Sequence, residues 1–83
     1  MALSKELTSR PLSSIAGEIS GDWKKVNYAA QPYLDAMSEL TSIEDDYYYD
    51  SAKSVVLYFL ANAGSWRGDT ARRVKTELKE MAK

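Results

Sequence analysis

The sequence predicts an all-α protein, a compact single-domain bundle of four to five short helices. Apolar residues recur at steps of three and four along most of the chain, which is the spacing of a buried helix face. No segment shows the strict alternation of apolar and polar residues that is typical of a half-buried strand. The 83 residues supply enough apolar surface for only one core, so we expect a single domain over residues 1–83.

The first clear helix is expected to begin at Pro11, because proline suits the first turn of a helix. Ser20 and Gly21 form a natural stop, after which Asp22 is placed to cap the next element. The residues that precede this helix, 1–9, are expected to be frayed. The predicted buried face consists of Leu12, Ile15, Ala16 and Ile19.

Two further helical stretches are predicted on either side of Pro32. Residues 23–30 keep the helical spacing of apolar side chains, and the proline then forces either a kink or a new helix. Asp35 and Glu39, four residues apart, are expected to face outward from the second stretch. Its predicted buried stripe consists of Tyr33, Leu34, Met37 and Leu40.

The strongest helical pattern follows a cap at Asp50 or Ser51. Leu57 and Tyr58 lie off its apolar arc, so this helix is expected at the centre of the fold with several neighbours. Gly64 is expected to end it in the left-handed conformation. The arc itself consists of Ala52, Val55, Val56, Phe59, Leu60 and Ala63.

The last helix is expected to start at a cap on Ser65, and Gly68 in its first turn has no explanation from the sequence. Its predicted buried stripe consists of Trp66, Thr70, Val74, Leu78 and Met81. Opposite this stripe lies a second candidate surface, a basic one, made of Arg72, Lys75 and Lys79 and continued by Lys83. Basic residues near a helix C-terminus also favour the helix dipole, which is the ordinary explanation for them.

The composition excludes most enzyme classes. The chain has no Cys and no His, which removes disulfide scaffolds, zinc and iron–sulfur sites, thiol nucleophiles and histidine acid–base catalysis. Asp45 and Asp46 are adjacent rather than converging across a pocket, and no glycine-rich phosphate loop is present. We therefore expect no enzyme activity, no cofactor and no metal. An EF-hand is rejected because the acidic segment lacks the central glycine and closing glutamate.

Membrane and export signals are also missing from the sequence. The longest apolar run, Val55–Ala61, has seven residues, which is too short to span a membrane. The N-terminus lacks a hydrophobic signal core. We therefore expect a cytoplasmic protein.

The net charge of −1 hides a partition along the chain. Residues 26–52 carry six acidic residues and no Lys or Arg, whereas residues 65–83 carry a net charge of +3. Three successive tyrosines stand among the acids, and they cannot share one buried helix face, so at least one ring is expected to meet solvent or a partner. The ordinary alternative is capping and core packing. The candidate partner-binding residues are Glu44, Asp45, Asp46, Tyr47, Tyr48 and Asp50.

Residues 16–26 offer an alternative function, because they resemble the core of a helix-turn-helix DNA-binding unit. A small residue and an apolar residue three positions on precede a tight turn and a second apolar segment. The start of the recognition helix would then meet phosphates and base edges. The net negative charge of the chain argues against a dedicated nucleic-acid binder. The residues of this alternative site are Lys24, Lys25, Asn27 and Tyr28.

Five segments carry a resemblance that spans most of the chain. They are SRPLSSIA (9–16), DWKK (22–25), PYLDAM (32–37), DSAKSVVLYFL (50–60) and WRGDTARRVK (66–75). With these segments the chain resembles small uncharacterised proteins of bacteriophages, prophages and plasmids. The resemblance brings no assigned activity and no functional residues. It implies a context in which small non-enzymatic proteins bind and redirect a host protein, or regulate transcription.

Three hypotheses about function follow from the sequence. The first is a cytosolic binding protein that docks on a protein partner through its acidic, tyrosine-rich segment. The second is a small helix-turn-helix regulator that binds DNA, which makes nucleic acid the less favoured partner. The third is self-association, which the enrichment in Tyr and Trp favours.

Overall fold

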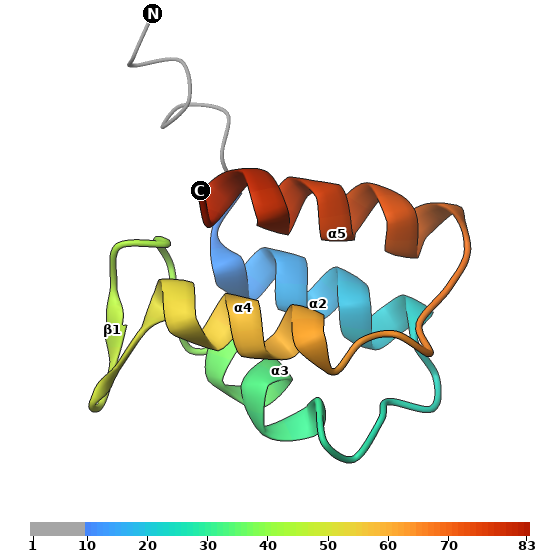
Figure 1. Ribbon diagram of the computed structural model, residues 1–83, viewed down its shortest axis with the longest axis horizontal. Helices are drawn as coiled ribbons and strands as arrows, with labels where there is room; N and C mark the ends of the chain where they lie inside the picture. The colour runs from blue at the N-terminus through green and yellow to red at the C-terminus, as the bar shows by residue number, and fades with distance from the viewer. Residues whose placement is uncertain (1–9) are drawn as a thin grey trace, which may run out of the picture.

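The computed structural model describes residues 10–83, which form four helices and one short β-hairpin (Figure 1). The prediction of a mostly helical fold is confirmed, but the prediction of a purely all-α fold is wrong because of the hairpin. The expectation about residues 1–9 lies outside the described residues. The elements are α2 (Leu12–Asp22), α3 (Gln31–Met37), β1 (Asp46–Tyr47), β2 (Asp50–Ser51), α4 (Ala52–Ala61) and α5 (Asp69–Met81).

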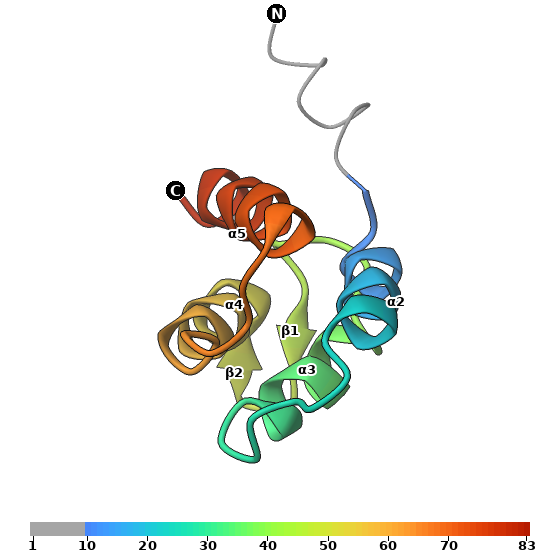
Figure 2. The same ribbon diagram turned by 90° about the vertical axis from the view of Figure 1, so that its right-hand side faces the viewer.

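The four helices form a ring in which each one packs against two others. Contacts join α2 to α3, α3 to α4, α4 to α5 and α5 to α2. In Figure 2, α5 lies opposite α3 in this ring of helices, with α2 and α4 between them. The hairpin lies at one end of the ring, against α4.

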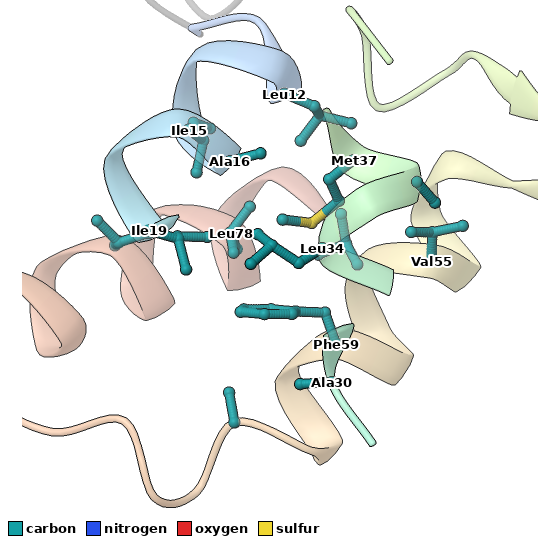
Figure 3. Close-up of a cluster of buried hydrophobic side chains, with 14 of the residues drawn as sticks. Leu12, Ile15, Ala16, Ile19, Ala30, Leu34, Met37, Val55, Phe59 and Leu78 are labelled. Atoms are coloured by element: carbon teal, nitrogen blue, oxygen red, sulfur yellow. The ribbon is translucent and has the colours of Figure 1, made fainter. Parts of the chain in front are cut away.

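The space inside the ring holds one apolar core, to which every helix contributes. All buried residues within residues 10–83 are hydrophobic. Near one end, the ring of Trp23 stacks on Trp66 with centroids 5.8 Å apart, and Phe59 meets Trp23 edge to face at 6.2 Å. The buried face predicted for α2 is confirmed. Figure 3 shows side chains from the four helices converging, among them Leu12, Ile15, Ile19, Leu34, Met37, Val55, Phe59 and Leu78.

The N-terminal end of α2 is tied to the chain that follows α3. The first amides of a helix have no partner within the helix. Here the Leu12 N–H donates to the Thr41 carbonyl at 2.9 Å, and the Ser13 N–H donates to the Leu40 carbonyl at 2.8 Å. These bonds satisfy two of the unpaired amides and fix α2 against the chain after α3.

Four charged residues link α2 to α5. Arg10 donates from Nε and Nη2 to both carboxylate oxygens of Glu77, at 3.0 and 2.7 Å, and its Nη1 lies 2.9 Å from Glu18 Oε1. Glu18 also pairs with Arg73. The two guanidinium groups, that of Arg73 first and then that of Arg10, hold the pKa of Glu18 below its ordinary value. We call Arg10, Glu18, Arg73 and Glu77 the arginine–glutamate network.

The helix predicted over residues 23–30 is wrong, because this segment is a loop. The Asn27 side chain accepts a bond from the Ala29 N–H at 3.0 Å and donates to the Asn62 carbonyl at 3.0 Å. Such side-chain bonds give the backbone an alternative to a helix. The preceding helix, α2, continues through its predicted stop to Asp22, whose carboxylate accepts the Trp66 indole N–H at 2.9 Å.

The boundaries of the last two helices are predicted in part. Ser51 caps α4 as predicted, with its Oγ accepting the Ser54 N–H at 3.1 Å. Gly64 does not adopt the left-handed conformation, since the one glycine with positive φ within residues 10–83 is Gly68. That glycine precedes α5 with φ of 112°, a conformation that side chains disfavour, which explains a glycine at this position. The last helix thus begins at Asp69 rather than after Ser65.

Candidate partner-binding surface

The acidic segment forms a closed loop and a hairpin rather than a helix start. Asp45 closes the loop, because its Oδ2 accepts the Ser42 N–H at 2.9 Å and the Thr41 N–H at 3.1 Å. These two backbone donors lower the pKa of Asp45. Its carbonyl accepts the Ala52 N–H at 2.8 Å, at the start of α4. Asp45 therefore holds the loop in place, although the sequence assigned it to partner binding.

The three successive tyrosines occupy three different environments. Tyr47 packs partly against the core, Tyr48 is 82% exposed, and Tyr49 is fully exposed. The expectation that at least one ring meets solvent is confirmed. Tyr48 and Tyr49 form the turn between β1 and β2, where Tyr47 pairs with Asp50. Tyr48 has a φ of 57°, which is unfavourable for a bulky residue.

Two acids of the neighbouring helix region join this group. Partial burial raises the pKa of Tyr47, and the negative charges of Glu39 and Asp35 add to the effect. The sequence predicted that Asp35 and Glu39 face outward, and both are exposed. It did not assign them to the candidate site, because their effect on Tyr47 depends on how α3 packs.

The hairpin adds two further carboxylates to this surface. Asp50 lies directly opposite Tyr47 in the antiparallel pair, so both side chains point to the same face of the hairpin. Asp46 and Asp50 are both exposed, and Asp46, which pairs with Ser51, points to the opposite face of the hairpin from Tyr47 and Asp50. The five ion pairs within residues 10–83 use Glu18, Asp69, Glu77 and Glu80, and none uses an acid of this surface. We call this group the tyrosine–acid surface: Asp35, Glu39, Asp46, Tyr47, Tyr48 and Asp50.

A second pair of aromatic rings lies on the seam between α3 and α4. Tyr33 and Tyr58 stack with centroids 5.4 Å apart and an interplanar angle of 28°. Tyr58 is 53% exposed, and its neighbour Leu57 is 48% exposed. The prediction that α4 has several neighbours is confirmed for the described chain, yet this side of the helix stays partly uncovered. Sequence patterns identified neither this ring pair nor its exposure.

The basic stripe predicted on α5 is largely engaged within the fold. Lys75 donates from Nζ to the Trp66 carbonyl at 2.6 Å, and its ammonium lies 5.9 Å from the centroid of the Trp66 ring. Burial lowers the pKa of Lys75, and the charges of Lys79 and Arg67 lower it further. Arg72 pairs with Asp69 one turn earlier, at 3.2 Å, in a highly exposed position. Lys79 is exposed.

The residues of the helix-turn-helix alternative lie in the loop between α2 and α3. Lys24, Lys25 and Tyr28 are exposed there, but they are not on a helix. The Asn27 amide is used in holding the loop to α4 through Asn62. The recognition helix that this alternative requires is therefore not formed by residues 23–30. Binding of DNA through the loop itself stays a prediction.

The described part of the chain shows no sign of a metal centre. Within residues 10–83, no three acidic side chains are arranged to hold a metal ion. None of the helices in that range is long and apolar enough to cross a membrane.

Comparisons with known proteins give no relative from which a function is transferred. No protein-family model matches the chain, no curated protein matches its sequence, and no solved structure matches its fold. The tyrosine–acid surface is therefore interpreted from its own geometry.

Proposed function

We propose that this chain is a non-catalytic binding protein that docks on a basic protein partner through the tyrosine–acid surface. One observation carries the proposal: exposed tyrosine rings stand among carboxylates that take part in no ion pair within residues 10–83. Tyrosine gives a large contact area and a hydroxyl at low entropic cost, and it is enriched at interfaces. Uncompensated carboxylates attract a partner of opposite charge and orient it on approach.

The biological setting that we propose follows from the resemblance to small proteins of phages and mobile elements. In that setting the chain acts in the cytoplasm and redirects a host protein. A host protein with a basic groove, such as one that binds nucleic acid, carries positive charge that is complementary to the tyrosine–acid surface. The chain would then compete with nucleic acid for that groove.

The proposal is tested by affinity capture from host lysate with two charge-reversed variants. Asp46→Lys with Asp50→Lys changes the tyrosine–acid surface, and Asp45 is kept because it holds the loop. Asp69→Lys with Glu80→Lys makes the same change in net charge on α5. We expect only the hairpin variant to lose the captured partner, while circular dichroism shows unchanged helix content in both. Equal capture by the two variants would refute the site.

Parallel captures with and without nuclease separate the proposal from its alternative. A partner that is retained after nuclease treatment supports protein binding. A partner that disappears with nuclease, together with salt-sensitive duplex binding that Lys24→Ala and Lys25→Ala abolish, supports the DNA-binding regulator instead.

A further inference from the structure

The ring of Tyr48 is an exposed platform whose orientation is set by its neighbours. It is 82% exposed, and it meets the ring of Tyr47 at 4.7 Å and 84°, in an edge-to-face contact. Tyr47 is itself packed against the core. Tyr48 also lies at the turn of a hairpin that α4 holds in place. A ring in this position offers a face to a partner without a large loss of side-chain freedom on binding.

The charges around this platform select a cation. Asp50 lies opposite Tyr47 in the hairpin and points to the same side as Tyr47, and the negative charges of Glu39 and Asp35 also act on Tyr47. Residues 26–52 contain no Lys or Arg, and Lys53 in the first turn of α4 takes part in no ion pair within residues 10–83. Across the ring of helices, α5 lies opposite α3 (Figure 2). A positively charged side chain of a partner thus meets both an aromatic face and carboxylates.

From this combination we infer that the surface recognises arginine side chains of a basic protein segment, in preference to lysine. The planar guanidinium stacks on an aromatic face, is more weakly hydrated than an ammonium group, and donates two parallel bonds to a carboxylate. Lysine is attracted by the same charges but stacks less well and forms no such fork. The inference rests on the proposed function, because it names the chemistry of the partner at the same surface.

The test uses two synthetic peptides of equal length and charge, in which either arginine or lysine alternates with serine. Isothermal titration against the full chain is expected to show roughly two- to fivefold tighter binding of the arginine peptide, the ratio that one exposed cation–π contact supplies. Amide NMR shifts are expected to concentrate at Tyr47, Tyr48 and Asp50. Added salt is expected to weaken both complexes, since both depend on the carboxylates.

A variant and a matched control test whether the preference for arginine depends on the aromatic ring of Tyr48. Tyr48→Gly removes the platform, and glycine accepts the positive φ of this position, so the hairpin is expected to persist. We expect the preference for the arginine peptide to fall in this variant to the part that the bidentate bond to a carboxylate supplies. Tyr28→Ala is the matched control, because Tyr28 is 91% exposed but lies in the loop before α3. The control is expected to keep the preference for arginine.

Several outcomes would overturn the arginine inference. The first two are equal affinity of the wild-type chain for the two peptides and binding of neither peptide. The others are a preference that Tyr48→Gly leaves undiminished and NMR shifts that map to another face. A salt-sensitive dimer whose contacts include Tyr48 would also overturn it, because the occupant would be a second copy of the chain. None of these results decides the proposed function, which stands or falls with capture by the Asp46 and Asp50 variant.

Discussion

On the side of the molecule formed by α2 and α5, four acids take part in ion pairs, whereas the hairpin side carries carboxylates outside any ion pair of residues 10–83. Glu18 and Glu77 each meet an arginine of the arginine–glutamate network. Asp46 and Asp50 take part in none of these pairs. Paired charges join two helices and support the fold. Carboxylates without such a counterion add nothing of that kind to the fold, and they are the ones free to meet a partner.

The backbone shows the same contrast between the two sides. The first amides of α2 are satisfied by the carbonyls of Thr41 and Leu40. On the hairpin, Tyr48 is held at a φ of 57°, which costs free energy for a residue with a side chain. Such local strain persists at sites where function requires it. We therefore expect substitutions on the α2–α5 side to change stability, and substitutions on the hairpin to change binding.

The largest loss of stability is expected from Trp66→Ala. Trp66 is buried, its ring stacks on Trp23, and its indole N–H bonds to Asp22 at the end of α2. Truncation of a buried aromatic costs about 3–5 kcal/mol, much of the stability of a domain of this size. Urea denaturation followed by circular dichroism measures this loss. A decrease in the free energy of unfolding of less than about 2 kcal/mol would contradict the role of Trp66 in holding the segment before α5 against the end of α2.

A smaller loss is expected from Arg10→Ala. This change leaves Glu77 and Glu18 partly buried with one arginine fewer, at an expected cost of about 1–2 kcal/mol after allowance for solvent exposure. Arg72→Ala removes an exposed pair within α5 and is expected to cost no more than about 0.5 kcal/mol. Urea denaturation of both variants measures the two decreases in the free energy of unfolding. Equal decreases would show that the arginine–glutamate network contributes no more to stability than an exposed surface ion pair.

The fold was predictable from sequence where a pattern of apolar residues decides it. The buried face of α2, the buried Val74, Leu78 and Met81 of α5 and the Ser51 cap depend on residues close in the chain, and local spacing identifies them. In the stripe predicted for α5, Thr70 is only partly buried, and the buried Ala71 was missed. The loop over residues 23–30 was missed because Asn27 bonds to Asn62, 35 positions away. The hairpin was missed because each strand has two residues, too few for an alternating pattern.

The sequence identified the segment that contains the candidate site, but not which of its residues face a partner. The run of tyrosines among acids marked residues 44–50 correctly as a segment with exposed rings. Sequence alone does not separate Asp45, which binds backbone amides, from Asp46 and Asp50, which face solvent. It also does not reveal that the charge of Glu39 acts on Tyr47, since that effect depends on packing in three dimensions.

Because the backbone at Tyr48 is strained, we expect the usual order of stability of alanine and glycine variants to be reversed there. At most positions glycine is less stable than alanine by about 0.5–1 kcal/mol. At Tyr48 the positive φ penalises any side chain, so Tyr48→Gly is expected to be more stable than Tyr48→Ala by about 1 kcal/mol. At Tyr49, which is fully exposed and lacks a positive φ, Tyr49→Ala is expected to be the more stable. Thermal melting of the four variants tests both signs, and the same sign at both positions would show that Tyr48 is unstrained.

The smallest expected effect is a change in the pKa values of two carboxylates, Glu18 and Asp45. Both pKa values are lowered, and the two residues lie on different sides of the molecule. Arg73 and Arg10 lower the pKa of Glu18, and the amides of Ser42 and Thr41 lower that of Asp45. Each carboxylate stabilises the fold above its ordinary pKa, about 4.3 for Glu and 3.9 for Asp, and this contribution is lost as the pH falls through the lower value in the folded state.

Salt is expected to separate these two carboxylates, because it screens charge pairs but leaves a backbone hydrogen bond intact. In NMR titrations of the side-chain carboxyl carbons, the pKa of Glu18 is expected to rise toward its ordinary value at about 1 M salt. The pKa of Asp45 is expected to change less. Equal rises would mean that Asp45 is held by charge rather than by its two amides, and the two sides of the molecule would then not differ in the way that their contacts indicate.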